Sequence, residues 1–171
     1  MDKAELARRI KQAAYLEGDF VLRSGRKSRY YLDKYLFETD PAILAELGRR
    51  LAEHAGGADQ IAGAELGGVP LAAAAAMACG KSFLIVRSAR KDYGTAKALE
   101  GKLAAGARVL LVEDVATTGG QVLEAAKVLT AAGAKVTKIV AVIDRQEGAR
   151  ENIESAGFTF ESLLTKQDLG V

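Results

Sequence analysis

Cysteine and histidine are nearly absent from this sequence, which contains one of each, Cys79 and His54. A lone cysteine cannot close a disulfide within the chain, and such usage is typical of proteins from a reducing compartment. Metal sites built on Cys and His side chains need several of these residues close together. The sequence therefore excludes a metal site of that kind, and we expect a cytoplasmic location.

Long hydrophobic runs and an excess of one charge are missing too. The longest apolar run, Val69–Cys79, has 11 residues, whereas a membrane-spanning helix needs about 20. The 24 Lys and Arg residues nearly balance the 22 Asp and Glu residues, and no clustered basic stretch indicates a nucleic-acid-binding surface. The charged first residues do not fit a signal peptide. We expect a protein that binds neither membranes nor nucleic acids.

The length and composition fit one globular domain spanning residues 1–171. Hydrophobic residues make up 49% of the chain and charged residues 27%, which is too apolar for a disordered protein. A chain of this length can bury roughly two thirds of the surface of its unfolded form, so it needs no disulfide or metal to fold.

Residues 1–58 are expected to form a small hood of helices and a hairpin. Asp2 and Glu5 make a capping pattern for a first helix, and Gly18 is placed to end it. Two β-rich runs, Phe20–Leu22 and Tyr30–Leu32, flank a turn and indicate a hairpin. A second helix should begin at Thr39 or Asp40, because Pro41 then occupies the first helical position.

Residues 59–171 alternate between strands and helices. Near-continuous apolar runs indicate strands that are buried on both faces, and alternation with helices indicates a parallel sheet. The expected strands are Gln60–Ala64, Ser82–Val86, Val109–Val112 and Val136–Ile143, and the expected helices are Leu71–Ala78 and Val122–Ala131. The predicted fold is therefore α/β, a mostly parallel twisted sheet flanked by helices.

One segment, residues 87–102, breaks this pattern. It has no apolar periodicity, and it carries five Lys or Arg residues and two glycines, Gly94 and Gly101. Long irregular segments in compact domains are usually functional or disordered. We expect a mobile loop here, with the two glycines giving it freedom to move.

The strongest functional signal is VLLVEDVATTGGQ, residues 109–121. A buried strand delivers Glu113 and Asp114 to the sheet edge where open α/β sheets bind ligands. The loop Ala116–Gly120 then opens a helix, and its backbone N–H groups can bind an anion. Carboxylates would repel that anion, so they fit sugar hydroxyls or a divalent cation. The expected ligand is a sugar phosphate, and the alternative is a capped strand–helix turn with two solvated acids.

This segment resembles the phosphoribosyl diphosphate (PRPP) motif of type I phosphoribosyltransferases, in which two hydrophobic residues and an acidic pair precede Thr-Thr-Gly-Gly. The resemblance implies the fold of that family. It also implies that Glu113 and Asp114 hold the ribose hydroxyls and that the loop binds the 5′-phosphate. The implied PRPP contacts in this motif are Glu113, Asp114, Val115, Ala116, Thr117, Thr118, Gly119, Gly120 and Gln121.

Three further segments are similar to orotate phosphoribosyltransferases. FVLRSGRKSRYYLD (20–33) resembles their N-terminal signature, ARKDYGT…EG (89–101) their mobile catalytic loop, and VIDRQEGAR (142–150) their Asp-Arg-Gln-Glu segment. The implied reaction joins orotate to PRPP and releases orotidine 5′-monophosphate and pyrophosphate, with Mg²⁺, in pyrimidine biosynthesis.

The resemblance also assigns residues outside the PRPP motif. Lys91, Arg87 and Asp114 are implied to be catalytic, and Arg87, Arg90, Lys91 and Tyr93 to bind the pyrophosphate end of PRPP. The implied orotate contacts are Thr117, Arg145, Arg23, Tyr31 and Leu32. No residue is assigned as a metal ligand. The resemblance further implies a homodimer in which the loop 87–102 reaches the partner's active site.

Two positions depart from the family pattern. Ser88 follows Arg87 where many relatives have a lysine, and Glu65-Leu66-Gly67-Gly68 stands where some relatives also have one. Two other functions stay open, a phosphoribosyltransferase for another base and a non-catalytic regulator that senses PRPP. The first would not need Arg145 to meet a carboxylate. The second should have lost Lys91 or gained a basic face.

Overall fold

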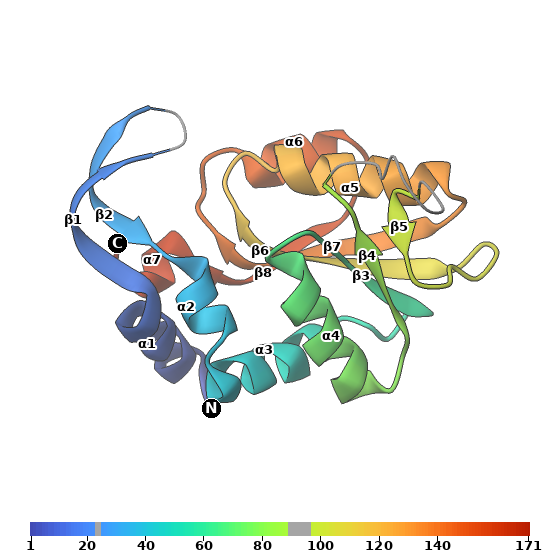
Figure 1. The fold of residues 1–171 in the computed structure, drawn as a ribbon, viewed down its shortest axis with the longest axis horizontal. Coiled ribbons are helices and arrows are strands. Elements are labelled where there is room, and N and C mark those ends of the chain that lie inside the picture. The colour runs from blue at the N-terminus through green and yellow to red at the C-terminus, as the bar shows by residue number, and fades with distance from the viewer. Residues whose placement is uncertain (23–24, 89–96) are drawn as a thin grey trace.

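The structure of the protein is a computed structural model, and it describes residues 1–22, 25–88 and 97–171. The N-terminal part begins with a helix and a hairpin that projects from the body of the molecule (Figure 1). Its elements are α1 (Lys3–Ala14), β1 (Tyr15–Val21), β2 (Lys27–Leu32), α2 (Lys34–Glu38) and α3 (Pro41–Glu53).

The two long helices of this part begin where the sequence predicts. The Asp2 side chain caps α1 by accepting from the Glu5 N–H at 2.8 Å. Asp40 caps α3, with Pro41 at its first position. These side chains satisfy backbone N–H groups that a helix cannot pair internally.

The prediction that Gly18 ends the first helix is wrong. The helix ends at Ala14, because Tyr15 takes up extended backbone and pairs with Leu32 across the hairpin. Gly18 lies instead within β1, where the register shifts between Glu17 and Phe20. The aromatic and aliphatic side chains around Gly18 suit a strand, and pairing with β2 outweighs the helical pattern.

The remaining elements build one six-stranded sheet of order β5-β4-β3-β6-β7-β8, parallel throughout except for the pairing of β4 with β5. This confirms the predicted α/β architecture. The elements are β3 (Gln60–Ala64), α4 (Gly68–Cys79), β4 (Phe83–Val86), β5 (Leu99–Glu100), β6 (Arg108–Ala116), α5 (Gly120–Ala131), β7 (Lys135–Asp144), α6 (Ala149–Ser155), β8 (Phe160–Thr165) and α7 (Lys166–Leu169).

Helices cover both faces of the sheet. Figure 1 shows α5 and α6 on one face, and α3 and α4 on the other beside the N-terminal helices. Each face has its own hydrophobic core: Leu129 and Ile153 belong to the α5/α6 side, and Leu47 and Leu71 to the other. Burial on both faces explains why the central strands read as continuous apolar runs.

The strand β6 is longer than predicted, and this matters for the site. It continues through Glu113 and Asp114 to Ala116, pairing with β7 along this length. Both acids therefore sit on a sheet strand and not in the loop that follows it. Because successive side chains of a strand point to opposite faces, the two acids must enter different surroundings.

Within residues 87–102, the structure adds a short strand that the sequence did not indicate. Leu99 and Glu100 form β5, which pairs with β4 in the antiparallel sense. Residues 89–96 lie outside the described part of the chain, so the prediction of a mobile loop is not tested there. No helix among the described residues is long and apolar enough to cross a membrane.

Candidate functional site

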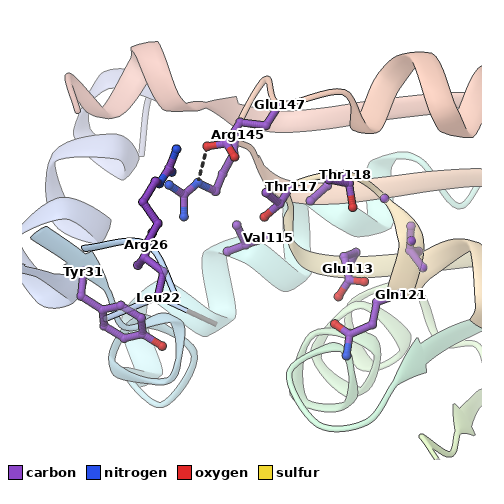
Figure 2. A pocket seen from close by; sticks show the side chains of 14 residues that line it. Leu22, Arg26, Tyr31, Glu113, Val115, Thr117, Thr118, Gln121, Arg145 and Glu147 are labelled. Atoms are coloured by element: carbon purple, nitrogen blue, oxygen red, sulfur yellow. Dashed lines mark ion pairs between the residues drawn. The ribbon is translucent and has the colours of Figure 1, made fainter. Parts of the chain in front are cut away.

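A pocket of about 830 Å³ opens at the carboxyl end of β6, beside the hairpin. Its volume is within the range of small-molecule sites. Figure 2 shows hairpin side chains on one side of it and the end of β6 with the start of α5 on the other. The lining residues are Leu22, Arg26, Tyr31, Glu113, Val115, Ala116, Thr117, Thr118, Gly119, Gly120, Gln121, Val122, Arg145 and Glu147.

The turn from β6 into α5 has the geometry of an anion-binding loop. Gly119 is the N-cap of α5 with φ +81°, a left-handed conformation that favours glycine. Among the described residues, no side chain caps this helix, so its first N–H groups can donate to a ligand, and the helix dipole favours an anion there. From α6, Asn152 Nδ2 donates to the Thr118 carbonyl oxygen at 2.8 Å and holds the loop in place.

The two acids of β6 have different surroundings. Glu113 is 7% exposed and lines the pocket. Burial, followed by the field of Asp114, raises the pKa of the Glu113 carboxyl well above its ordinary value. Asp114 is 2% exposed and does not line the pocket. The structure therefore brings Glu113 to the pocket wall and places Asp114 behind that wall.

Asp114 is held by residues that the sequence analysis missed. Its Oδ2 lies 2.7 Å from Lys34 Nζ on α2. Burial alone would lower the pKa of Lys34, but the hydrogen bond to Asp114 and the attraction of the acids outweigh it, and the pKa is raised. Glu38, at the end of the same helix, is 1% exposed and interacts with Asp114. The missed signal was the pair of charges at a four-residue spacing next to the hairpin.

Arg145 follows β7 and reaches the pocket from the neighbouring strand. Its backbone N–H donates to the Ala116 carbonyl oxygen at 2.9 Å, which ties it to the anion loop. Its Nε lies 3.3 Å from Glu147 Oε1, and its Nη2 donates to the Tyr30 hydroxyl at 3.4 Å. Figure 2 marks the ion pair with Glu147. Arg145 therefore forms an ion pair with Glu147 and also lines the pocket.

The hairpin contributes an aromatic and a basic side chain. Tyr31 is 43% exposed, lines the pocket and packs against Phe20 with ring centroids 5.6 Å apart. Arg26 and Leu22, neither of them predicted as site residues, also line the pocket. Leu22 and Arg26 bracket the hairpin turn, joined by a hydrogen bond from the Leu22 N–H to the Arg26 carbonyl oxygen at 2.9 Å.

Arg87 lies at the end of β4, outside the pocket lining, between two carboxylates. Its Nη1 is 3.5 Å from Glu65 Oε1 and 3.7 Å from Glu100 Oε1. The Ser88 N–H also donates to Glu65, at 3.2 Å. Glu65 therefore holds Arg87 and Ser88 at the base of the loop 87–102.

The other predicted site residues either lie outside the described part of the chain or do not line the pocket. Arg23, Arg90, Lys91 and Tyr93 lie outside the described residues. Leu32 packs against the hydrophobic core and does not line the pocket, and its contact with a base stays a prediction.

The sequence matches the phosphoribosyl transferase domain family over residues 37–167. It is 45% identical to the orotate phosphoribosyltransferase of Methanocella arvoryzae, over 96% of this chain and 95% of that one. Among solved structures, an orotate phosphoribosyltransferase of Mycobacterium tuberculosis has a TM-score of 0.90 at 34% identity, with full coverage of both chains. Another structure of the M. tuberculosis enzyme, in complex with PRPP, has a TM-score of 0.85 at 32% identity, again with full coverage of both chains.

Proposed function

The chain belongs to the orotate phosphoribosyltransferase family, and we propose that it transfers ribose 5-phosphate from PRPP to orotate. The products are orotidine 5′-monophosphate and pyrophosphate, and the reaction serves pyrimidine (UMP) biosynthesis. The observation that carries the proposal is one pocket that joins an anion-binding loop and a buried acid to an arginine. One part of the pocket is complementary to a sugar phosphate, and another part, with Arg145, is complementary to a nucleobase that carries a carboxylate.

The loop and β6 would bind the sugar phosphate. The 5′-phosphate would accept hydrogen bonds from the backbone N–H groups of residues 117–120, at the start of α5. Glu113, with Asp114 behind it, would accept hydrogen bonds from the ribose hydroxyls. The acids suit the neutral hydroxyls and the N–H groups suit the phosphate, so the two contacts fix the direction in which PRPP lies.

Arg145 would recognise the orotate carboxylate. A guanidinium can donate two parallel hydrogen bonds to a carboxylate, which uracil lacks. Glu147 and the Tyr30 hydroxyl already contact this side chain at 3.3 and 3.4 Å, so it is oriented before a ligand arrives. Thr117, Tyr31, Leu32 and Arg23 are the other proposed orotate contacts.

Catalysis in this proposal is the stabilisation of charge. The orotate ring nitrogen attacks the anomeric carbon and gives up its proton to solvent, the bond to pyrophosphate breaks with its electron pair leaving on pyrophosphate, and the configuration at that carbon inverts. Negative charge grows on the leaving pyrophosphate, and Lys91, Arg87 and Arg90 are the cations proposed to meet it. Arg87 would exchange its contacts with Glu65 and Glu100 for the pyrophosphate when PRPP binds.

We propose that Mg²⁺ arrives with the pyrophosphate of PRPP. Within residues 1–22, 25–88 and 97–171, no group of three or more His, Cys, Asp or Glu side chains is placed to hold a metal ion, and Mg²⁺ commonly binds through substrate phosphates with only one or two carboxylates. Bound to pyrophosphate oxygens, the ion would neutralise part of the leaving group's charge.

We further propose that the protein is a cytoplasmic homodimer in which the loop 87–102 of one subunit covers the active site of the other. Such a lid would keep water from the ionising sugar.

A base panel tests the proposed reaction. Purified protein is mixed with PRPP and Mg²⁺, and the loss of orotate absorbance is followed, with uracil and hypoxanthine assayed in parallel by pyrophosphate release. We expect turnover of orotate alone, and its loss when a chelator removes Mg²⁺. Turnover of another base in place of orotate would contradict the role of Arg145, and no turnover of any base would favour the PRPP-sensing regulator.

A further inference from the structure

Glu38 is a buried carboxyl group that the proposed reaction does not use. It lies at the end of α2 and is 1% exposed. Neither of its side-chain oxygens has a hydrogen-bond partner in the described part of the chain. An uncompensated buried charge would be costly, so the position calls for a proton or a partner.

The position of Asp114 supplies that partner. A Cβ atom added to Gly67 would lie 1.7 Å from Asp114 Oδ2 and 3.2 Å from Glu38 Oε1, so both carboxyl groups converge on the same glycine. Asp114 Oδ2 is itself buried, with Lys34 as its ionic partner at 2.7 Å. Two carboxyl groups side by side can form a hydrogen bond only when one of them carries the proton.

The charges around the pair indicate which group carries it. Lys34 pairs with Asp114 and favours the ionised form of that residue. Burial, and next the repulsion by Asp114 and Glu113, raise the pKa of Glu38 to about 8 against the opposing attraction of Lys34. These groups on α2 and β6 are the charged side chains that act on Glu38 most strongly. The proton therefore resides on Glu38 at neutral pH.

We propose that Glu38 is a positioning residue for the sugar site, and that its carboxylic acid donates a hydrogen bond to the Asp114 carboxylate. Together with Lys34, it would fix the orientation of the acid directly behind Glu113. The inference rests on the proposed function, in which this acidic pair receives the ribose of PRPP. Gly67 has a part in it as well, since a side chain there would separate the two carboxyl groups.

The arrangement predicts an effect of pH on PRPP binding. When Glu38 loses its proton, the hydrogen bond to Asp114 becomes a repulsion, and another negative charge faces an anionic substrate. PRPP affinity should therefore fall as the pH rises through about 8. In the Glu38→Gln variant the amide still donates a hydrogen bond and cannot ionise, so the part of this loss that comes from Glu38 should vanish, whereas Glu113, whose pKa is also raised to about 8, still ionises.

Calorimetric titration with PRPP and Mg²⁺ tests this prediction over about pH 6.5 to 9.5, a range that brackets the pKa of about 8 of Glu38. We expect wild type to lose roughly tenfold in affinity above pH 8 and Glu38→Gln to lose only about threefold, through the remaining ionisation of Glu113. The matched control is Glu151→Gln, at an exposed position on α6, which should follow wild type. An unchanged alkaline loss in Glu38→Gln would overturn the proposal.

If the Glu38→Gln variant folds poorly, measurements on the wild-type protein still test the proposal. Because the folded-state pKa of Glu38 lies above its ordinary value of 4.5, its contribution to stability is full below that value and is lost as pH rises through about 8. Wild-type Tm should fall between about pH 4.5 and 8 and level off above pH 8, and the infrared carbonyl band of a protonated acid should disappear near pH 8. A wild-type band that does not titrate near pH 8 would contradict the assignment. These binding and spectroscopic data do not depend on turnover, so a failure of the orotate assay would leave them interpretable.

Discussion

The carboxyl edge of β6 and the hairpin β1–β2 face the same pocket but are built in opposite ways. Residues of β6 are buried almost without interruption between two helical layers. The hairpin is a separate two-stranded sheet with mostly exposed residues, including Val21 at 73% and Tyr31 at 43% exposed. The edge presents buried carboxyl groups and backbone donors, whereas the hairpin presents aromatic, aliphatic and basic side chains, Tyr31, Leu22 and Arg26.

This difference indicates a division of labour. Buried carboxyl groups and oriented N–H groups keep their geometry without a ligand, which suits sugar and phosphate recognition. A two-stranded ribbon is only marginally stable by itself, and it can adjust to a flat base. Arg145 joins the two regions, because its backbone bonds to the anion loop and its side chain contacts Tyr30 of β2.

The largest effect on activity is expected from a substitution of Lys91, which belongs to neither region. This residue is proposed to act in the chemical step, so its loss should lower kcat and leave orotate binding nearly unchanged. Lys91→Ala should lower kcat by about 10²–10³-fold, the usual cost of removing a donor that stabilises developing negative charge. Orotate binding should change little. Lys97→Ala, an exposed lysine of the same segment, is the control for general loss of charge. Unchanged turnover in Lys91→Ala would remove this residue from the mechanism.

Gly67→Ala tests the rigidity of the sheet edge. The new Cβ would lie 1.7 Å from Asp114 Oδ2, and relieving such overlap in a packed site costs typically 1–3 kcal/mol. Gly67 has φ −67°, which alanine accepts, so the effect is steric. We expect PRPP affinity to fall at least tenfold by calorimetry. Gly57→Ala has open space around its Cβ and should match wild type. Equal affinities in both variants would mean that the edge adjusts freely.

Arg145→Ala should weaken orotate capture. A hydrogen bond to a charged group contributes about 1.5–3 kcal/mol, so the KM for orotate should rise roughly 10- to 100-fold while the KM for PRPP stays within twofold. Arg145→Lys should recover only part of the loss, because a lysine lacks the planar fork. Arg29→Ala, on the exposed side of the hairpin with a 95% exposed side chain, serves as the control. Unaltered orotate kinetics in Arg145→Ala would refute the carboxylate assignment.

The smallest effect is expected from Tyr30→Phe. It removes a hydroxyl that accepts a long hydrogen bond, 3.4 Å, from Arg145 and keeps the ring that stacks on Tyr15. We expect the KM for orotate to rise about two- to threefold, since a hydrogen bond as long as 3.4 Å is weak. Tyr15→Phe preserves the stacking and should leave this KM unchanged. A change in the KM for PRPP, with no change in the KM for orotate, would contradict the assignment of Tyr30 to the orotate part of the pocket.

Much of the sheet and the anion loop could be predicted, because their signals are local. Buried parallel strands read as apolar runs, and the Thr-Thr-Gly-Gly turn follows directly on one of them. The short elements α2 and α6 were not predicted, since each has too few residues for a helical period to show. The end of α1 was misplaced because Tyr15 pairs with Leu32, a partner 17 positions away that no local pattern reveals.

Within the site, the pocket residues that belong to a single motif could be predicted from the sequence. The residues that hold them in place could not. The sequence places Glu113, Thr117 and Gly119 together because they are neighbours in the chain. Lys34 and Glu38 come to Asp114 only through the packing of α2 beside β6. Glu65 likewise meets Arg87 only across β3 and β4.

The central claim is that the sheet edge and Arg145 bind different halves of one ligand, and a double-variant cycle tests it most directly. Affinity for orotidine 5′-monophosphate would be measured for wild type, Gly67→Ala, Arg145→Ala and the double variant. Independent sites add in free energy to within about 0.5 kcal/mol, so the account predicts that the two losses multiply. A double variant that binds no worse than the weaker single variant would contradict the division of the pocket.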